Sequence, residues 1–446
     1  MTTANPAMTD DEFSRQLEDS GAKWIVCSDD KVEAAAKAAM KHRIPLDHVV
    51  TFDPSLDKTV KAKNIRGILE AMKAQHVKEE DVFVDVPERD LELSTAILPY
   101  SSGTTGTAKG VCLSHYNVMA NLLQQYCVSA KYMDPKSNSS LCILPTLSRH
   151  GHDECTAAYD ISGNQKYKLT NLPLVPPVCL LLAKSPLVDS YDLSSITRIA
   201  VGAAPLGRDL ELELKRRFSG AAVFQGYGLT EMTKVGLRIQ KPQSTSTSAS
   251  AAISGTIGCI VPNMECKVID DEGKELGPNI DGEICVRGPN VTRQYLAKPE
   301  ATKLTIVDGW LHTGDIGHYD DRQLFYIVDR KKELIKYKGL QVAPAELENH
   351  LLTHPDVIDA AAIPLYDPSQ ATELPLAFVV LRDGAKTHPD EIRAYVDGKV
   401  ANHKKLRGGV RIIDAIPKSA SGKILRRILK DKINEEQRGT GTSAKL

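Results

Sequence analysis

The spacing of apolar residues changes repeatedly along the middle of the chain, between short β-rich runs and the wider spacing of an amphipathic helix. Residues 195–204 and 221–228 are runs of the first kind, and residues 206–218 between them carry an apolar stripe at helical spacing. A strand, a helix and a second strand in this order are typical of an α/β domain, in which helices cover a layered sheet. We therefore predict such a domain here.

Beyond this domain the pattern becomes richer in hairpins. Residues 266–276 and 282–288 predict short strands, with turn-forming residues at 271–273. After residue 339 a smaller α+β pattern follows. It comprises a predicted helix over 344–357 that opens on a proline, strands over 357–364 and 376–384, and a helix over 388–405.

We place a domain boundary near Arg330. Residues 1–329 are predicted to form a large layered α/β domain, and residues 330–446 a small α+β domain that ends in a polar tail. The most apolar run, residues 172–183, is too short to cross a bilayer and contains three prolines. It predicts a buried segment rather than a transmembrane helix, and no signal peptide is visible at the start of the sequence.

Composition and charge narrow the class of protein. The 446 residues carry a formal net charge of −1, so no overall field attracts nucleic acid or an anionic membrane. Basic runs at 402–411 and 423–432 are typical of solvated helix faces. The nine cysteines are scattered without a C-x-x-C pair, which indicates a reducing compartment and argues against a disulfide framework or a zinc site.

The stretch "PYSSGTTGTAKGVCLSH", residues 99–115, is rich in glycine and hydroxyl side chains. It predicts a strand, a loop and a strand, followed by a helix that starts at His115 and is capped by Ser114. Glycines let the backbone approach a ligand, and the hydroxyls and Lys109 add donors for phosphate oxygens. By itself, the stretch is also compatible with a mobile loop that holds no ligand.

A phosphate loop of the Walker A type is excluded by the spacing. That motif needs G-x-x-x-x-G-K-[ST] followed by a helix. Here Lys109 lies three residues after Gly106, Gly110 follows it, and a strand comes next.

Six motifs follow one another along the chain. They are S-S-G-T-T-G-T-A-K-G (101–110), G-A-A-P (202–205), Q-G-Y-G-L-T-E (225–231), W-L-H-T-G-D (310–315), V-D-R-K-K-E-L-I-K-Y-K-G-L-Q-V-A-P-A-E (328–346) and P-K-S-A-S-G-K-I-L-R (417–426). In this order they resemble the adenylate-forming acyl-CoA synthetase superfamily, specifically its 4-coumarate–CoA ligase and firefly luciferase branch. The resemblance covers almost the whole chain.

The resemblance implies a ligase that uses ATP, Mg²⁺ and coenzyme A. A small-molecule carboxylic acid would react with ATP to give an acyl-adenylate and pyrophosphate, and the CoA thiol would then displace AMP. Because the first step brings a carboxylate against a polyphosphate, it needs positive charge, N–H donors and a metal ion. The implied fold is a large layered domain with a small mobile C-terminal domain.

The resemblance also implies a role for individual residues. The phosphates would be held by the loop, Thr230 would contact the α-phosphate, and Glu231 would ligate Mg²⁺. Tyr227 would stack on adenine, Asp315 would accept the two ribose hydroxyls and Arg330 would lie beside the ribose. The full set implied for ATP or AMP comprises Ser101, Ser102, Gly103, Thr104, Thr105, Gly106, Lys109, Gly202, Ala203, Ala204, Gln225, Gly226, Tyr227, Gly228, Asp315 and Arg330.

Two further sets belong to the predicted small domain. Lys423 would bridge the reacting carboxylate and the α-phosphate, and Lys332 matches the hinge of the family. Lys336, Lys338 and Gly339 would lie on the face that serves the thioester step, after rotation of the small domain. Taken singly, each residue has a plainer interpretation, such as a core tyrosine, a turn aspartate or a surface lysine.

The sequence departs from the family in two places. Strands and helices that normally precede residue 1 are not found, and a section of the acyl-binding wall is expected to be deleted where residues 146–163 intervene. Such a loss is expected to expose apolar faces. Two functions therefore stay open: an acyl-CoA synthetase for a fatty or aryl-propenoic acid, as in fatty acid or phenylpropanoid-like metabolism, or a degenerate relative that binds nucleotide or a partner without turnover.

The sequence closes on Ala444, Lys445 and Leu446, a near match to the S-K-L peroxisomal signal. We expect recognition by the peroxisomal import receptor, with the cytoplasm as the alternative location.

Overall fold

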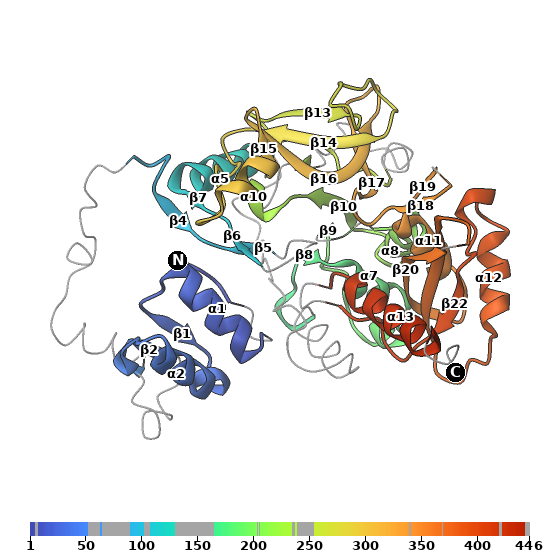
Figure 1. Cartoon of the computed structure of the whole chain (residues 1–446), viewed down its shortest axis with the longest axis horizontal. Coiled ribbons are helices and arrows are strands. Elements are labelled where there is room, and N and C mark those ends of the chain that lie inside the picture. Colours follow the sequence, from blue (N-terminus) through green and yellow to red (C-terminus); the bar gives the residue numbers. More distant parts are fainter. Residues whose placement is uncertain are drawn as a thin grey trace. The chain divides into compact units, whose positions relative to one another are not determined.

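A computed structural model describes most of the chain (Figure 1). The described residues are 1–4, 8–51, 63–64, 90–101, 108–129, 165–202, 204, 206–233, 237–238, 254–338, 340–367, 369–418 and 422–441. They fall into two compact units. Unit 1 comprises Met1–Leu122, Thr230–Thr233 and Pro289–Ile306, and unit 2 comprises Leu123–Leu229, Lys234–Gly288 and Val307–Leu446. The boundary near Arg330 falls inside unit 2 and stays a prediction.

Unit 1 begins with a small parallel sheet, β1–β2–β3, and two helices. A capping box starts α1, because the Thr9 hydroxyl accepts from the Glu12 amide and the Glu12 carboxylate accepts from the Thr9 amide. The core between helices and sheet contains Leu17, Ile25 and Val49. The elements are α1 (Asp10–Ser20), β1 (Ile25–Cys27), η1 (Asp29–Lys31), α2 (Val32–Lys41), η2 (Leu46–His48), β2 (Val49–Thr51) and β3 (Lys63–Asn64).

The rest of unit 1 contains the glycine-rich stretch. As predicted, a strand precedes the loop and a strand follows it: β5 (Tyr100–Ser101) pairs antiparallel with β6 (Lys109–Gly110). The Ser114 hydroxyl accepts from the Asn117 amide at 3.1 Å, which confirms the predicted helix cap. The other elements are β4 (Thr95–Ile97), β7 (Leu113–Ser114), α5 (His115–Ser129), which continues into unit 2 from Leu123, η6 (Thr230–Met232) and α10 (Pro299–Thr305).

Helix α5 carries an exposed apolar stripe at helical spacing. Its residues are between 44% and 63% exposed, although large apolar side chains normally pack against a neighbouring element. They are Tyr116, Met119, Leu122, Leu123 and Tyr126. The expectation that a shortened acyl-binding wall exposes apolar faces stays a prediction, because residues 130–164, which follow α5, lie outside the described residues.

Unit 2 contains the predicted α/β layers. Strands β8, β9 and β10 are parallel neighbours in a sheet of order β12-β11-β10-β9-β8. The predicted buried segment 172–183 is confirmed, with Leu172 and Cys179 buried, but Pro176 divides it into a strand and a helix. The elements are β8 (Asn171–Leu174), α7 (Pro176–Lys184), η5 (Pro186–Ser190), β9 (Arg198–Val201), α8 (Arg208–Arg217), β10 (Ala222–Tyr227), β11 (Leu237–Arg238) and β12 (Cys259–Ile260).

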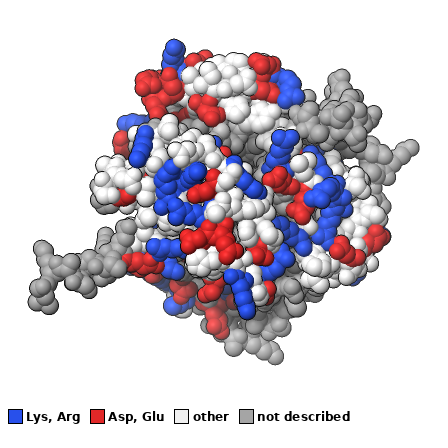
Figure 2. Space-filling model, turned by 90° about the vertical axis from the view of Figure 1, so that its right-hand side faces the viewer, with Lys and Arg blue, Asp and Glu red and all other residues white. Residues whose placement is uncertain are grey.

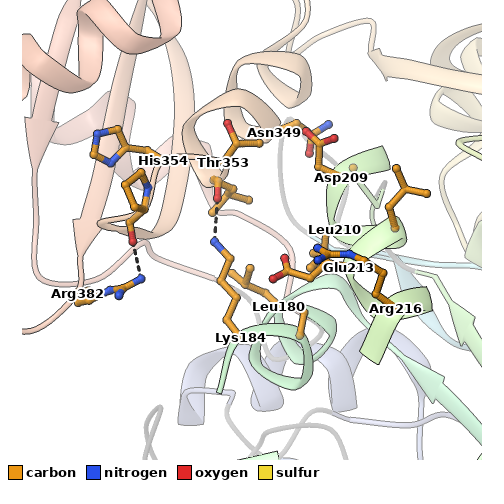
Figure 3. Close-up of a pocket in the computed structure, with 15 residues that line it drawn as sticks. Leu180, Lys184, Asp209, Leu210, Glu213, Arg216, Asn349, Thr353, His354 and Arg382 are labelled. Atoms are coloured by element: carbon orange, nitrogen blue, oxygen red, sulfur yellow. Dashed lines mark hydrogen bonds between the residues drawn. The ribbon is translucent and has the colours of Figure 1, made fainter. Parts of the chain in front are cut away.

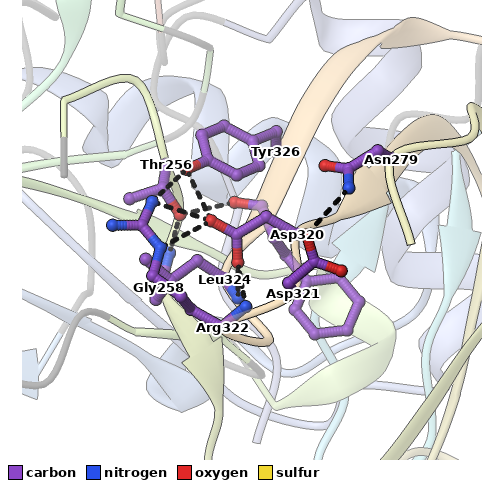
Figure 4. Close-up of polar contacts among 9 residues, drawn as sticks. Thr256, Gly258, Asn279, Asp320, Asp321, Arg322, Leu324 and Tyr326 are labelled. Atoms are coloured by element: carbon purple, nitrogen blue, oxygen red, sulfur yellow. Dashed lines mark hydrogen bonds and ion pairs between the residues drawn. The ribbon is translucent and has the colours of Figure 1, made fainter. Parts of the chain in front are cut away.

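A second sheet of unit 2 is formed by antiparallel strands. The turn predicted at 271–273 is present, with Gly273 at φ 83° and the Asp270 carboxylate accepting from the Lys274 amide. Asp320 closes another turn by accepting from the amides of Arg322 and Leu324 (Figure 4). The strands are β13 (Glu265–Ile269), β14 (Gly282–Arg287), β15 (Ile306–Val307), β16 (Trp310–Tyr319) and β17 (Phe325–Arg330).

The C-terminal part of unit 2 is built around the antiparallel pair β20–β21, with β22 parallel to β21. Ala360 and Val379 pack in one core with α11 and α12, while Ile363 and Phe378 pack in another with α13 (Figure 1). Burial on both faces explains the continuous apolar runs in these strands. The elements are β18 (Ile335–Tyr337), β19 (Leu340–Val342), α11 (Pro344–Leu352), β20 (Val357–Asp367), β21 (Thr372–Leu381), α12 (Pro389–Asp397), η7 (Asn402–Lys404), β22 (Gly409–Ile412) and α13 (Arg426–Gly441).

Two predicted helices of this region are too long. The helix expected over 388–405 ends at Asp397, where Gly398 occupies the cap, and residues 402–404 form a separate turn of 3-10 helix. The helix expected over 344–357 ends at Leu352, because Pro355 cannot continue it and Val357 already belongs to β20.

Figure 2 shows acidic and basic side chains interspersed over one face of the molecule.

Other expectations concern cysteines and membranes. Every cysteine that the structure describes is a free thiol. Among the described residues, no helix is long and apolar enough to cross a bilayer.

Candidate functional site

The second and third motifs meet at one edge of a sheet in unit 2. Strands β9 and β10 are parallel, with Val201 opposite Gln225, so Gly202 and Gly226 follow at the same edge. A Cβ placed on Gly202 would lie 3.6 Å from the Gly226 carbonyl oxygen. Carboxyl ends of parallel strands are a common place for ligands in α/β folds. Ala204 lies in the described part of this segment, and Ala203 lies outside the described residues.

Gln225 makes a contact that its predicted role does not involve. Its Oε1 accepts from the Leu206 amide at 2.9 Å, and its Nε2 donates to the Leu206 carbonyl oxygen at 3.3 Å. The buried side chain thus fastens β10 to the segment before α8. Its contact with nucleotide stays a prediction, as does that of Gly228.

Tyr227, Asp315 and Arg330, called here the nucleoside cluster, come together in unit 2 from three separate motifs. The Tyr227 hydroxyl donates to Oδ2 of Asp315 at 2.5 Å. The Arg330 Nε lies 3.1 Å from Oδ1 of the same carboxylate. Strands β16 and β17 place Asp315 directly opposite Arg330. Asp315 is 3% exposed, so its two oxygens face this cluster rather than bulk water.

The backbone before Asp315 is shaped by its neighbours. Gly314 has φ 70°, a left-handed conformation that strains other residues, and its amide donates to Oε1 of Glu283 at 3.2 Å. The Thr313 hydroxyl accepts from the Asp315 amide at 3.1 Å and donates to a carbonyl of β14 at 2.7 Å. Lys331 holds the other Glu283 oxygen at 3.1 Å. These bonds set the direction of the Asp315 side chain.

Burial dominates the electrostatics of the nucleoside cluster. It raises the pKa of Asp315 above its ordinary value, and the charge of Arg330, the Tyr227 hydroxyl and the charge of Lys423 oppose that rise. Burial and then the Asp315 charge raise the pKa of Tyr227 well above its usual range, so its hydroxyl remains a donor. A buried carboxylate among donors can accept two neighbouring hydroxyl groups of a ligand.

Lys423 is therefore close enough to Asp315 to act on its pKa, although their motifs are distant in sequence. The nearby helix α13 is anchored at its first residue, Arg426, which pairs with Glu333 at 2.7 Å and with Glu348 at 2.7 Å. Glu333 follows the predicted hinge residue Lys332. This ion-pair network ties the segment after Lys423 to the segment after the hinge.

The residues predicted for thioester formation lie on the β18–β19 hairpin. Lys336 and Lys338 are exposed, and the Lys336 amide donates to Glu373 at 2.7 Å. Lys338 has φ 48°, the left-handed conformation common in tight turns. Lys332 is exposed in the turn after β17, and Gly339 lies outside the described residues. Among the described residues, Lys336 and Lys338 form no hydrogen bond with Tyr227, Asp315 or Arg330 of the nucleoside cluster.

The predicted phosphate loop is described only at its two ends. Ser101 and Lys109 end and begin the strands of the pair β5–β6, and β5 lies against η6, which contains Thr230 and Glu231. Gly110 is tightly packed, since an added Cβ would lie 3.2 Å from Leu98. The loop residues Ser102, Gly103, Thr104, Thr105 and Gly106 lie outside the described residues.

A residue that the sequence did not predict, Tyr295, contacts both ends of this arrangement in unit 1. Its hydroxyl donates to Oε1 of Glu231 at 2.8 Å. The Lys109 Nζ lies 4.9 Å from the centre of its ring, a cation–π distance. We call Lys109, Glu231 and Tyr295 the phosphate cluster. The sequence alone did not indicate Tyr295, because it lies outside the quoted motifs and its contacts are with residues distant in the sequence.

The residues present fit a magnesium ion bound mainly through a substrate. No group of three His, Cys, Asp or Glu side chains is arranged as a metal cage among the described residues. Mg²⁺ commonly takes one or two carboxylates and completes its shell with phosphates and water. The half-buried carboxylate of Glu231 is a hard oxygen donor of this kind.

A cleft of about 650 Å³ lies elsewhere in unit 2, beside α7, α8 and α11 (Figure 3). It is lined by charges of both signs, among them Lys184, Glu213 and Arg216. Lys184 donates to the Leu352 carbonyl oxygen at 2.9 Å. None of the predicted site residues lines this cleft.

Comparisons with known proteins agree with the six motifs. Residues 1–296 match the family described as AMP-binding enzyme, and residues 346–423 match the AMP-binding enzyme C-terminal domain. The chain is 38% identical over 452 residues to 4-coumarate–CoA ligase 3 of Oryza sativa subsp. japonica, covering 97% of this chain and 78% of the relative.

Solved structures are also similar. ATP-bound MatB from Rhodopseudomonas palustris superposes with TM-score 0.75 at 26% identity, over 96% of this chain and 82% of that one. The anthranilate CoA ligase AuaEII, in complex with anthranoyl-AMP, gives TM-score 0.81 at 21% identity, over 98% and 83%. The second likeness shows the fold alone.

Proposed function

The chain belongs to the AMP-binding enzyme family, and on that premise we propose how its residues divide the work of an ATP-dependent acid–CoA ligase and which acid they ligate. The enzyme joins a carboxylic acid to coenzyme A through an acyl-adenylate. ATP activates the acid with release of pyrophosphate, and the CoA thiolate then attacks the acyl carbon and displaces AMP. The proposals below concern the finer assignments within this reaction.

The nucleoside cluster holds the adenosine part of ATP and of the acyl-adenylate. Asp315 accepts from the two ribose hydroxyls, Arg330 keeps its carboxylate ionised, and Tyr227 offers its ring to adenine. The observation that supports this most directly is the convergence of three motifs on one buried carboxylate, at 2.5 Å from Tyr227 and 3.1 Å from Arg330. A buried site makes each of these hydrogen bonds stronger than it would be in water.

The phosphate cluster neutralises the triphosphate. Lys109 supplies positive charge, and Glu231 holds Mg²⁺ together with phosphate oxygens, as carboxylates do in phosphoryl-transfer sites. When bound, the metal ion withdraws charge from the phosphates and so reduces their repulsion of the incoming carboxylate. Thr230, beside Glu231 in η6, offers its hydroxyl to the α-phosphate.

Two lysines of the C-terminal part serve different half-reactions. Lys423 stabilises the developing charge between the acid and the α-phosphate, which agrees with its electrostatic action on Asp315. Lys336 belongs to the exposed β18–β19 hairpin and serves thioester formation. A rotation at Lys332 would exchange the two lysines at the reacting atoms.

The acid is an aryl-propenoic acid of the 4-coumarate type, or alternatively a fatty acid. The identity of 38% to a 4-coumarate–CoA ligase over 97% of the chain favours the first. The exposed apolar stripe of α5 favours a second candidate function, a relative that binds nucleotide with poor turnover, because it is consistent with an incomplete acyl-binding wall.

The assignments are tested by separating the half-reactions. Pyrophosphate release is measured with a panel of aryl-propenoic and fatty acids, and thioester formation is measured from supplied acyl-AMP and CoA. Lys423→Ala should abolish the first and spare the second, Lys336→Ala should do the reverse, and the exposed Lys432→Ala on α13 should change neither. Equal losses in both half-reactions would contradict the division, and ATP binding without pyrophosphate release would favour the second candidate.

Peroxisomal import is a separate proposal, supported by the tripeptide Ala444–Lys445–Leu446, which lies outside the described residues. A fluorescent fusion that ends in this tripeptide should enter peroxisomes, and deletion of Leu446 should leave it in the cytosol.

A further inference from the structure

Tyr295 is attached by its backbone to the strand that carries Lys109. Val111 and Tyr295 form an antiparallel bridge, the Leu296 amide donates to the Gly110 carbonyl oxygen at 2.8 Å, and the Cys112 amide donates to Gln294 at 3.1 Å. Tyr295 is 6% exposed and packs with Val111 and Leu113. Its position relative to Lys109 is therefore set by the backbone rather than by a flexible side chain.

The same segment is attached to η6. The Thr292 amide donates to the Glu231 carbonyl oxygen at 2.7 Å, and the Thr233 hydroxyl donates to the Asn290 carbonyl oxygen at 2.6 Å. Residues 289–306 thus form one hydrogen-bonded connection between the strand of Lys109 and the turn of Glu231, all within unit 1. Tyr295 is the residue of this connection that contacts both charged side chains.

We propose that Tyr295 is a positioning residue for the metal–triphosphate part of the site, an inference that rests on the proposed function. Its hydroxyl donates to Oε1 of Glu231 at 2.8 Å, which would leave Oε2 as the carboxylate oxygen for a magnesium ion. Its ring lies 4.9 Å from the ammonium group of Lys109 and favours that position of the cation through a cation–π contact. One buried side chain thus contacts both the cation and the carboxylate that are proposed to meet the metal–triphosphate.

The chemistry explains why a tyrosine suits this position. A carboxylate near a lysine would otherwise turn toward it and form an ion pair, which would occupy both groups before ATP arrives. The hydroxyl takes one carboxylate oxygen and the ring takes the ammonium, so each charge is satisfied by the same neutral residue. A hydrogen bond to a charged group and a cation–π contact are each strong enough to hold such an arrangement.

The test separates the hydroxyl from the ring. Tyr295→Phe removes the bond to Glu231 and keeps the ring, whereas Tyr295→Leu removes both. Tyr326→Phe is the matched control, because its hydroxyl also donates to a carboxylate, that of Asp320 at 3.3 Å, and both residues belong to unit 2 rather than unit 1 (Figure 4). Calorimetric titrations measure the affinity for ATP with and without Mg²⁺ and the affinity for AMP, and electron paramagnetic resonance measures Mn²⁺ bound in the presence of ATP.

For Tyr295→Phe we expect the gain in ATP affinity on adding Mg²⁺ to fall about tenfold, with a matching loss of bound Mn²⁺. AMP affinity should stay unchanged, and the unfolding temperature should fall by no more than about 4 °C, as expected for the loss of one hydrogen bond. Tyr295→Leu should in addition weaken binding of metal-free ATP, since Lys109 loses its support. Tyr326→Phe should match the unsubstituted protein in all measurements.

Three results would overturn the proposal. An unchanged Mg²⁺ dependence in Tyr295→Phe, while Glu231→Gln loses it, would reject Tyr295 and leave the proposed function intact. A parallel loss of AMP binding would mean that the substitution damages the fold and that the role is structural. If neither the unsubstituted protein nor Glu231→Gln shows a Mg²⁺-dependent gain, the proposed metal site itself fails, and this inference fails with it.

Discussion

The Tyr227 hydroxyl donates a 2.5 Å hydrogen bond to Oδ2 of Asp315, across 88 residues of sequence. The opposite oxygen of the same carboxylate faces Arg330, from the neighbouring strand. Three motifs that are separate in the chain thus share one buried negative charge. Such a charge is costly to bury, and proteins keep it where a ligand or a reaction uses it.

Replacement of Asp315 by asparagine tests whether that charge serves binding rather than stability. Burial raises the pKa of Asp315, so the folded chain holds the carboxyl proton more firmly than the unfolded chain does. At a pH above both pKa values of Asp315, the ionised carboxylate lowers the free energy of unfolding, because it is buried. This destabilisation decreases as pH falls below the raised pKa of the folded chain. We expect Asp315→Asn to unfold at pH 7 with a free energy equal to or above that of the unsubstituted chain.

Binding should respond in the opposite direction. If Asp315 accepts from the ribose hydroxyls, as proposed, loss of this charged acceptor costs about 1.5–3 kcal/mol of binding free energy, so the affinity for AMP should fall at least tenfold. Chemical denaturation and calorimetric titration measure the two effects. Asp321→Asn, at an exposed carboxylate that accepts from Asn279, is the control and should change neither. A marked loss of stability in Asp315→Asn would mean that the Arg330 pair outweighs the cost of burial.

The β16–β17 pairing that places Asp315 opposite Arg330 depends on Gly317. A Cβ on this residue would lie 2.2 Å from the Tyr326 carbonyl oxygen and 2.8 Å from the Ile284 side chain. Because the first contact is with backbone, no side-chain rotation relieves it. We expect Gly317→Ala to reduce the free energy of unfolding by more than about 2 kcal/mol and to weaken AMP binding.

Gly277→Ala is the matched control, since no atom lies within 4 Å of the added Cβ there. It should change stability by no more than about 0.5 kcal/mol. If Gly317→Ala is as stable as this control, β16 and β17 do not approach each other as closely as the 2.2 Å contact indicates.

A pH dependence of stability should arise at Glu348. Burial raises its pKa to about 7 from 4.5, against the opposing charge of Arg426, while Asp329 and Glu333 add to the rise. Between these values the folded chain binds a proton that the unfolded chain releases, so stability falls as pH rises from 4.5 to 7. The accumulated effect is at most roughly 3 kcal/mol, since each pKa unit corresponds to about 1.4 kcal/mol.

Glu348→Gln removes this titration and keeps an acceptor for Arg426 and for the Ala362 amide. Its stability relative to the unsubstituted chain should therefore improve as pH rises from 5 to 8, as measured by urea denaturation at several pH values. The opposite slope would show that the ion pair with Arg426 dominates over burial.

The order of elements was largely predictable because local rules and tertiary packing agree. Ser114 caps α5 as its sequence position indicates, and β9, α8 and β10 follow the spacing of their apolar residues. The overlong helix at 388–405 was wrong because its polar C-terminal half offers no apolar periodicity, and Gly398 ends the helix. Helix ends depend on single backbone conformations, which a periodic pattern does not resolve.

The candidate site was predictable only where motifs carry it. Asp315 and Arg330 were both assigned to the ribose, and the structure places them in contact. Tyr295 could not be predicted as a site residue, because its contacts with Lys109 and Glu231 join segments that are distant in sequence. The hydrogen bond between Gln225 and Leu206 could not be predicted either, since the presence of a glutamine in a motif does not indicate which backbone groups its side chain contacts.

The apolar stripe of α5 gives the last prediction. If the acyl-binding wall is incomplete in this chain, Met119, Leu122 and Leu123 meet water, as their exposures of 55%, 58% and 59% indicate. Polar residues with good helix propensity should then be tolerated, because exposed substitutions rarely change stability by more than about 0.5 kcal/mol. The triple variant Met119→Gln, Leu122→Lys, Leu123→Glu should unfold near the temperature of the unsubstituted chain and should aggregate less in sedimentation experiments.

The buried Leu172→Ala supplies the contrast, since it is 1% exposed and should cost about 2–5 kcal/mol. If the triple variant instead loses as much stability as Leu172→Ala, the α5 stripe is covered in solution. The segment 146–163 would then be a replacement that completes the wall rather than a deletion. In that case carboxylate selectivity should be as sharp as in a complete ligase, and the pyrophosphate assay with the acid panel would reveal a single preferred acid.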